Sequence, residues 1–237
     1  MTTLYIVATP IGNLEDVSLR VLRILKEVDM IVCEDTRVTK KLLERYDIKT
    51  PTLSYFQHSG AAKTEQIIEL LESGKNLAYV SDAGTPGISD PGGKLVEAVV
   101  ERFGNEVKIV SVPGPCALIA ALSISGFPAD EFLFLGFPPH KKGRQTFFRN
   151  LAEEAKKRTV VFYESPHRIL KAFEEVKNFA PGANLVVCRE LTKKFETTYR
   201  GNPEKVIESL KTDKILGEFV IVVKGFVQKS KPQAQDF

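Results

Sequence analysis

One long loop of this chain has the composition of a ligand-binding loop. It runs from Ser81 to Gly93 and holds four glycines and two prolines in thirteen residues. Glycine lets a backbone approach a ligand closely, and proline fixes the path of the chain. Loops this long in compact domains are usually functional or disordered, and this one is too constrained for disorder. We expect it to contact a ligand; the alternative is a long structural loop before a helix.

Two shorter loops are weaker signals when each is taken alone. Thr9-Pro10-Ile11-Gly12-Asn13 follows an apolar run, and it lacks the glycine spacing of dinucleotide-binding and phosphate-binding loops. No motif therefore supports NAD or ATP. Val112-Pro113-Gly114-Pro115 opens an uncharged helix of small residues, whose free N–H groups could bind a polar group. An ordinary turn is an equally good interpretation of either loop.

The predicted elements of the N-terminal half alternate between strand and helix. The predicted strands are 4–8, 30–33, 76–80 and 107–110, and the predicted helices are 18–28, 37–46, 64–73 and 95–103. This order indicates a mainly parallel sheet covered by helices. In such sheets ligands bind at the carboxyl ends of the strands, where the three loops lie.

The C-terminal half is predicted to be a second α/β domain with more antiparallel character. Its predicted strands are 132–135, 159–163, 184–188, 197–200 and 219–223, and its predicted helices are 116–124, 141–157, one opened by Ser165-Pro166, and 203–210. We predict two α/β domains, 1–113 and 114–227, followed by a flexible tail over 228–237.

A basic segment in this second half is suited to RNA. Cations and two adjacent phenylalanines occur together between His140 and Arg149. RNA binding needs cations for phosphates and often flat groups for bases. The RNA-binding candidates are Lys141, Lys142, Arg144, Arg149 and Lys194. The alternative is a solvated helix face with Phe147 and Phe148 in the core.

Composition excludes several classes of protein. The 237 residues include 33 basic and 30 acidic ones, and 43% are hydrophobic, which excludes a disordered chain. Three cysteines and three histidines are scattered, so we expect neither a disulfide framework nor a metal site. The uncharged stretch 109–129 is broken by proline and glycine, which favours a buried strand–turn–helix over a membrane span. With no apparent signal peptide, we expect a cytoplasmic protein.

Taken together, the loops resemble those of the tetrapyrrole methylase family of S-adenosylmethionine-dependent methyltransferases. The segments that carry the resemblance are 7–14, 33–37, 80–92, 112–115, 162–168, 189–196 and 217–219. The resemblance implies two α/β domains with S-adenosylmethionine in the cleft between them, and a homodimer. It implies these cofactor-binding residues: Pro10, Gly12, Gly84, Thr85, Ile88, Cys116, Ala117, Phe162, Tyr163, Thr192 and Gly217.

The segments are most similar to a branch of the family that methylates a cytidine 2′-hydroxyl in the decoding region of small-subunit (16S) ribosomal RNA. The resemblance thus implies an enzyme whose partner is this RNA or the small subunit. Two alternatives are a small-molecule (precorrin-type) tetrapyrrole methyltransferase and a non-catalytic RNA-binding ribosome assembly factor.

A ribose hydroxyl is a poor nucleophile until its proton is accepted or its developing oxyanion is stabilised. Charged residues that follow the predicted strands could do either. The catalytic candidates are Glu34, Asp35, Arg37, Glu164, Arg168 and Lys193. Mutual ion pairing among such groups is the alternative interpretation.

Overall fold

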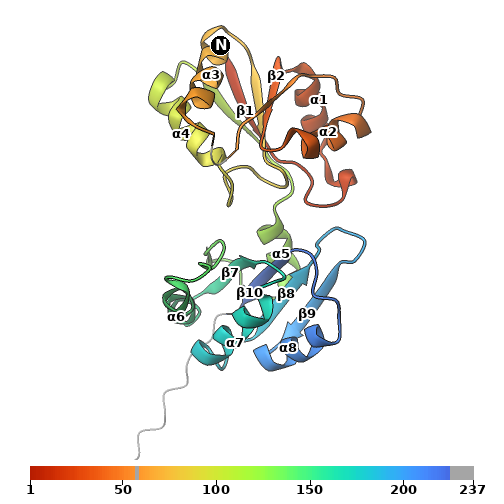
Figure 1. Ribbon diagram of the computed structural model, residues 1–237, viewed down its shortest axis with the longest axis vertical. Coiled ribbons are helices and arrows are strands. Elements are labelled where there is room, and N and C mark those ends of the chain that lie inside the picture. The colour runs from red at the N-terminus through yellow and green to blue at the C-terminus, as the bar shows by residue number, and fades with distance from the viewer. Residues whose placement is uncertain (57–58, 225–237) are drawn as a thin grey trace, which may run out of the picture. The chain divides into compact units, whose positions relative to one another are not determined.

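The structure is a computed structural model that describes residues 1–56 and 59–224 (Figure 1). The chain forms two compact units, of which the first ends at Cys116 and the second begins at Ala117. The boundary expected from the sequence lies three residues earlier, at 113. The predicted tail over 228–237 lies outside the described residues.

The first unit is built on a parallel sheet with the strand order β3-β2-β4-β1-β5. Its strands are β1 (Thr3–Val7), β2 (Met30–Cys33), β3 (Thr52–Ser54), β4 (Leu77–Val80) and β5 (Lys108–Val112). Every neighbouring pair is parallel, as predicted. The edge strand β3 was not predicted, because three residues with a single apolar side chain give no strand pattern.

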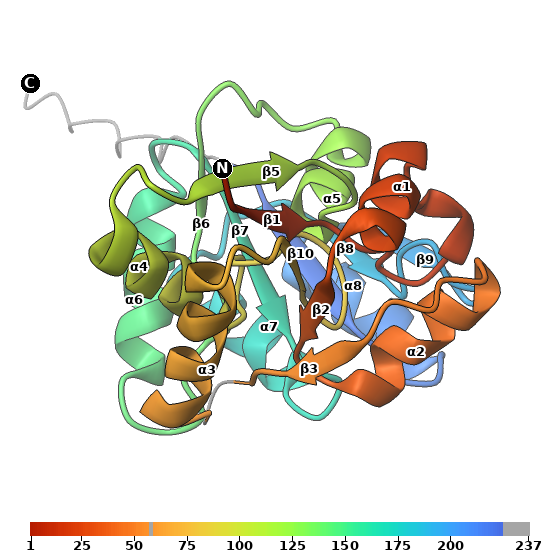
Figure 2. The same ribbon diagram turned by 90° about the horizontal axis from the view of Figure 1, so that it is seen from above.

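Helices cover both faces of this sheet (Figure 2). They are the short 3-10 helix η1 (Leu14–Asp16), α1 (Leu19–Glu27), α2 (Thr36–Arg45), α3 (Ala61–Glu72) and α4 (Gly92–Phe103). Apolar side chains of α1 and α2 pack with Val7, Ile31 and Cys33 on one face. Those of α3 and α4 pack with Leu4 and Val32 on the other. Alternate residues of one strand thus serve the two faces.

The order of the strands creates a crevice between β1 and β4. These two strands are neighbours, but α1, which follows β1, and α4, which follows β4, lie on opposite faces of the sheet. The loops after the two strands therefore diverge at the carboxyl edge. Such a topological switch point is where open α/β sheets bind ligands.

The second unit contains a mixed sheet with the strand order β6-β7-β10-β8-β9. Its strands are β6 (Phe132–Phe134), β7 (Thr159–Glu164), β8 (Leu185–Arg189), β9 (Thr197–Gly201) and β10 (Phe219–Val223). Its helices are α5 (Ala117–Ser125), α6 (Arg144–Glu154), α7 (Ile169–Phe179) and α8 (Pro203–Lys211). Only β6 and β7 pair in parallel, so the predicted antiparallel character is confirmed.

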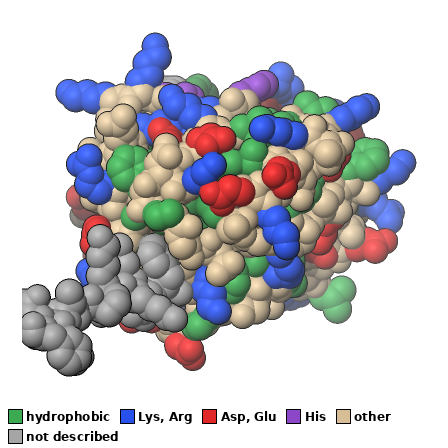
Figure 3. Space-filling view, turned by 90° about the horizontal axis from the view of Figure 1, so that it is seen from below, with side chains coloured by type: hydrophobic (Ala, Val, Ile, Leu, Met, Phe, Trp, Pro, Cys, Tyr) green, Lys and Arg blue, Asp and Glu red, His purple; other side chains and the backbone are tan. Residues whose placement is uncertain are grey.

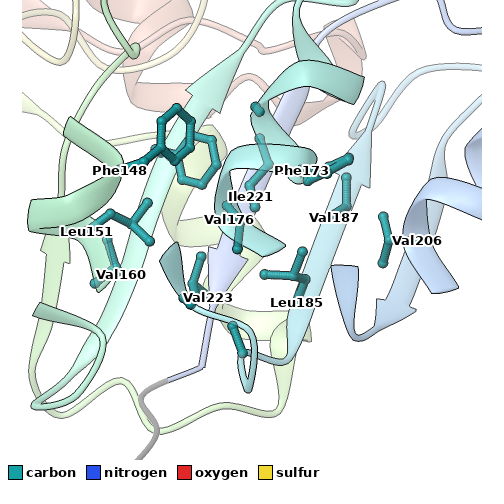
Figure 4. Packing of buried hydrophobic residues seen from close by; sticks show 14 of the residues in the cluster. Phe148, Leu151, Val160, Phe173, Val176, Leu185, Val187, Val206, Ile221 and Val223 are labelled. Atoms are coloured by element: carbon teal, nitrogen blue, oxygen red, sulfur yellow. The ribbon is translucent and has the colours of Figure 1, made fainter. Parts of the chain in front are cut away.

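The core of this unit lies between the sheet and α6, α7 and α8 (Figure 4). Phe148 is fully buried, and its ring stands perpendicular to that of Phe162 at 6.0 Å between centroids. Phe148 thus belongs to the core, as the alternative interpretation of the basic segment proposed. Helix α6 begins at Arg144, later than predicted, because Gly143 has a left-handed φ of 87° that ends the preceding turn.

Candidate functional site

The loops after β1 and β4 are joined by a pair of backbone hydrogen bonds. The Thr9 N–H donates to the Gly84 carbonyl at 2.9 Å, and the Gly84 N–H donates to the Thr9 carbonyl at 3.0 Å. Gly84 has φ 82°, and a Cβ there would lie 3.2 Å from the Ile11 side chain. The long loop therefore starts in a fixed position beside the Thr9–Gly12 turn.

The long loop is held from inside by one carboxylate. Asp90 Oδ1 accepts hydrogen bonds from the N–H groups of Gly87 and Gly92, each at 2.8 Å. Ser89, between them, has a left-handed φ of 68°, a conformation that non-glycine residues adopt mainly where the surroundings impose it. Asp90 thus shapes the loop.

The third loop joins the other two at the same edge. The Thr85 hydroxyl donates to the Pro115 carbonyl at 3.0 Å. A Cβ on Gly114 would lie only 3.0 Å from the Ala8 Cβ, so glycine permits this close approach. One edge of the first unit therefore gathers these predicted donor residues: Pro10, Gly12, Gly84, Thr85, Ile88 and Cys116.

The remaining predicted donor residues, Ala117, Phe162, Tyr163, Thr192 and Gly217, belong to the second unit. The side chain of Phe162 is fully buried in the core of that unit, so its predicted contact with the donor falls to its backbone. Tyr163 is half-buried and packs edge-on against two phenylalanines. The roles of the other residues stay predictions.

Three of the acidic residues meet where β2 and β4 end. Glu34 Oε1 accepts a hydrogen bond from the Asp82 N–H at 3.1 Å, and Asp82 Oδ1 accepts one from the Asp35 N–H at 3.0 Å. Asp82 was missed from the sequence, although its place two residues after the end of a predicted strand was a usable signal. The exchange of hydrogen bonds ties the two loops together and holds Glu34 in place.

The surroundings of Glu34 and Asp35 move their pKa values in opposite directions. Burial raises the pKa of Glu34; the Asp82 N–H opposes this, and the charges of Asp82 and Asp90 add to it. Hydrogen bonds from Arg37 lower the pKa of Asp35 to about 2. Asp35 also caps α2, because it accepts the Arg37 N–H at 2.8 Å. Of the two, Glu34 has the basicity that a proton acceptor needs.

Glu164 is enclosed by two arginines in the second unit. Its Oε2 accepts from Arg144 Nη1 at 3.0 Å, and its Oε1 lies 2.7 Å from Arg168 Nη2. The Glu164 side chain is 0% exposed and the Arg144 side chain 4%. Arg144 Nε also donates to Glu175 at 2.8 Å. These contacts correct the expectation that Arg144 faces RNA. They support the ion-pair alternative for Glu164 and Arg168, whose catalytic roles stay predictions.

The same arginines fix the segment that precedes α6. Arg144 Nη1 donates to the Pro139 carbonyl at 3.3 Å, and Arg168 Nη1 donates to the Pro138 carbonyl at 3.1 Å. The lysines that follow these prolines, Lys141 and Lys142, are exposed, as are Arg149 and Lys194. On the face drawn in Figure 3, basic side chains are interspersed with acidic ones rather than gathered in a single patch. Lys141 and Lys142 therefore project from an anchored segment.

Lys193 is already engaged by two carboxylates. Its Nζ donates to Glu190 at 2.8 Å and to Glu218 at 2.9 Å. Burial alone would lower the pKa of Lys193, but the hydrogen bonds to both glutamates raise it. Its catalytic role stays a prediction, and the contacts support the ion-pair alternative.

Residues 1–56 and 59–224 contain no group of three or more acidic, histidine or cysteine side chains that could hold a metal ion. No helix in that part of the chain has the length and apolarity needed to cross a membrane.

The edge of the first unit fits a small cationic ligand. Its three loops expose backbone at the switch point, and Glu34, Asp35 and Asp82 lie together at the ends of the adjacent strands. Their negative charges disfavour one another, which shows in the raised pKa of Asp82 after the larger effect of burial. A ligand with positive charge relieves this repulsion, and S-adenosylmethionine carries a sulfonium and an ammonium group.

Solved structures define the fold. The methyltransferase CobJ matches with a TM-score of 0.70 over 98% of both chains, at 19% identity. A uroporphyrin-III C-methyl transferase from Thermus thermophilus, solved with S-adenyl homocysteine, matches with a TM-score of 0.63 over 94% of this chain and 97% of the other, at 17% identity. At these identities the likeness establishes the fold alone.

The family follows from sequence. The family model of Tetrapyrrole (Corrin/Porphyrin) Methylases matches residues 3–207, so the chain belongs to this family. Membership confirms the predicted fold class and the predicted kind of enzyme, an S-adenosylmethionine-dependent methyltransferase.

Curated relatives are similar over most of their length. The chain is 44% identical to ribosomal RNA small subunit methyltransferase I of Thermotoga maritima, over 95% of this chain and 99% of the relative. It is 42% identical to the protein of the same name from Halalkalibacterium halodurans, over 98% of this chain and 78% of the relative. The Bacillus subtilis protein of that name is 44% identical over 95% of this chain and 76% of its own length.

The two arginines of α6 should behave differently when they are removed. Arg144→Ala leaves Glu164 buried without one of its partners, and we expect it to lower the free energy of unfolding by about 3–5 kcal/mol. Arg149→Ala removes only an exposed cation 5.9 Å from the Phe179 ring, and it should cost less than about 1 kcal/mol. Denaturant unfolding of both variants measures the difference, and equal losses would contradict the structural role of Arg144.

Proposed function

We propose that this protein transfers a methyl group from S-adenosylmethionine to the 2′-hydroxyl of a cytidine in the decoding region of small-subunit ribosomal RNA. The observation that carries the proposal is the identity of 42% and 44% to relatives named ribosomal RNA small subunit methyltransferase I, over nearly the whole chain. The cytidine and its 2′-hydroxyl come from the family resemblance. So does the homodimer, which the proposal includes together with the cytoplasmic location expected from the sequence.

The donor is held, in this proposal, by the loops at the edge of the first unit. Backbone groups of Pro10, Gly12 and Gly84 lie at the switch point, and Ile88 offers an apolar side chain that is 39% exposed. When bound, the donor supplies an electrophilic methyl group on a positively charged sulfur. The protein's main contribution is to position this group, because the transfer is an in-line displacement of an already reactive donor.

Glu34 accepts the proton of the attacking hydroxyl in this proposal. Its raised pKa makes it a stronger base than an ordinary glutamate, and the Asp82 N–H fixes its carboxylate. Asp35 is a poorer base, since its pKa is about 2 and its carboxylate accepts hydrogen bonds from Arg37. The RNA backbone is bound by exposed cations of the second unit, for which Lys141, Lys142, Arg149 and Lys194 remain the candidates.

The test is methyl transfer from labelled S-adenosylmethionine to small ribosomal subunits, followed by nucleoside analysis. Label on 2′-O-methylcytidine supports the proposal. Label only on a precorrin-type compound offered in parallel would establish the tetrapyrrole alternative. Tight binding of donor and RNA without transfer would favour a non-catalytic assembly factor.

A charge placed on the long loop should weaken donor binding. Ile88→Arg adds bulk and a positive charge beside a cationic ligand, and we expect its dissociation constant for S-adenosylmethionine to rise about ten-fold or more. Val100→Arg is the matched control, because Val100 is 49% exposed on α4, away from the loop. Isothermal titration calorimetry compares the two. Equal affinities in both variants would remove the loop from the donor site.

The pH dependence of transfer should follow Glu34. A base acts in its ionised form, so activity should fall as the pH drops through the raised pKa of Glu34. Glu34→Gln keeps an acceptor for the Asp82 N–H but removes the base, and should lower kcat by about 100- to 10,000-fold. Asp82→Asn removes a neighbouring negative charge, which lowers the pKa of Glu34 and moves the acid limb of the kcat profile to lower pH. An unmoved acid limb in Asp82→Asn would assign that limb to another group.

Neutralising the anchored lysines should change the salt dependence of RNA binding. The double variant Lys141→Gln, Lys142→Gln should reduce the slope of log affinity against log salt concentration by about 1.5. The control Lys26→Gln lies exposed on α1 in the first unit and should leave the slope as it is. A slope that is unchanged in the double variant would favour the alternative, in which these lysines belong to a solvated surface and do not bind RNA.

A further inference from the structure

A large cavity of the second unit lies apart from the basic segment. It has a volume of about 970 Å³, at the upper end of the ~300–1,000 Å³ range of ligand pockets. One wall is the loop between β8 and β9, and the other is the segment between α8 and β10. We name it the β8–β9 groove; its lining residues are Arg189, Glu190, Lys194, Phe195, Glu196, Thr197, Thr212, Asp213, Lys214, Leu216 and Gly217.

Two sets of contacts hold the walls of the groove together. Arg189 reaches across to the Leu216 carbonyl and to Asp213 Oδ2, each at 2.8 Å. The Glu190 carboxylate accepts the Glu218 N–H at 3.0 Å. It packs so closely on Gly217 that a Cβ there would lie 2.4 Å from its Cδ. The groove is therefore preformed, and a ligand need not order it.

Its wall also contains unusual backbone. Glu190 and Thr192 both have left-handed φ values, 53° and 66°, although neither is glycine. Such conformations persist only where the surrounding structure imposes them, and they concentrate at functional sites. The strained turn ends at Phe195 and leaves its side chain 65% exposed.

The acidic and basic residues of the groove differ in whether they have bonding partners. Its carboxylates have partners: Glu190 binds Lys193, Asp213 binds Arg189 and Tyr199, and Glu196 accepts the Thr192 N–H at 2.6 Å. Its lysines differ, since within the described part of the chain neither Lys194 nor Lys214 takes part in an ion pair. The groove thus presents two lysines that stand outside the ion pairs of its walls.

These lysines flank exposed apolar side chains. Lys194 Nζ lies 5.7 Å from the centroid of the Phe195 ring, and Leu216 on the facing wall is 60% exposed. An exposed aromatic ring next to free cations is the arrangement that binds single-stranded nucleic acid, because the ring stacks on a base and the cations contact phosphates. A base in a duplex is already stacked on its neighbours, so the exposed ring favours unpaired RNA as the ligand.

We propose that the β8–β9 groove binds an unpaired nucleotide of the RNA substrate, with its base stacked on Phe195 and the adjoining phosphates on Lys194 and Lys214. This inference rests on the proposed function, because it assumes an RNA substrate, and it assigns an RNA contact to the second unit. It gives Lys194, which was predicted to bind RNA, a partner in Lys214 and a site of defined shape.

The experiment measures the binding of a short fluorescein-labelled single-stranded RNA to the full chain by fluorescence anisotropy. Phe195→Ala should raise the dissociation constant about ten-fold or more, whereas Phe195→Trp, which keeps a stacking surface, should restore affinity. A fully paired RNA hairpin should show no difference among the three proteins. Equal affinity of Phe195→Ala and wild type for the single strand would overturn the proposal.

The lysines are tested through salt. Lys194→Gln with Lys214→Gln should reduce the salt slope for the single strand by about 1.4, while the exposed control Lys171→Gln on α7 should reduce it by less. Affinity for S-adenosylmethionine should be the same in all variants. A loss of donor affinity in Phe195→Ala would reassign the groove to the donor, whose predicted contacts include the adjacent Thr192 and Gly217. A change from dimer to monomer in sedimentation, with RNA affinity unchanged, would reassign it to a second copy of the chain.

Methyl transfer separates this proposal from the proposed function. If wild type methylates small ribosomal subunits and Phe195→Ala raises KM with little change in kcat, both proposals stand. If wild type transfers methyl groups and Phe195→Ala leaves KM and RNA affinity unchanged, the groove proposal alone fails. If wild type binds the single strand through Phe195 but methylates no ribosomal RNA, the groove stands and the proposed function fails.

Discussion

The pair of hydrogen bonds between Thr9 and Gly84 is the constraint on which the donor edge depends. Parallel strands β1 and β4 send their chains to opposite faces of the sheet, so nothing in the sheet itself keeps the following loops together. The Thr9–Gly84 pair does so, and Gly84 allows it because φ 82° is open to glycine. The third loop joins through Thr85 and the Pro115 carbonyl. A preformed edge suits a reaction in which positioning does most of the work.

Half-buried Glu34 and fully buried Glu164 show how surroundings decide the role of one residue type. Glu34 faces other carboxylates and a single N–H group, so its charge is poorly satisfied and it retains basicity. Glu164 is enclosed by Arg144 and Arg168, which satisfy its charge and remove it from solvent. The first arrangement favours proton transfer, and the second favours a rigid scaffold. Both glutamates directly follow or end a strand, so their positions in the sequence do not separate them.

Much of the fold was predictable because strands and amphipathic helices leave local patterns. The strand β2 at Met30–Cys33 was found with its exact limits, and the alternating order implied the parallel sheet. The short edge strand β3 was missed, since its pairing with β2 is a tertiary contact rather than a pattern. Helix α3 begins at Ala61, three residues before the predicted start at 64, because Gly60 precedes it with an extended backbone. Helix ends depend on such details of the chain path.

The functional residues could be predicted from the sequence where glycine and proline constrain the backbone. They could not be predicted where their role depends on charge. Glycine and proline indicate a constrained loop from the sequence itself, which is how the Ser81–Gly93 loop was found. A run of cations does not show which of its side chains will be exposed. Lys142 and Arg144 are two residues apart, yet one is exposed and the other is 4% exposed in an ion pair with Glu164, which lies twenty residues further along the chain. Which cation faces solvent is decided by that distant partner. The role of each cation in a basic segment therefore depends on where the acidic side chains lie in the fold. The same reasoning picks out Lys194 and Lys214, because the acidic residues near them bind other groups.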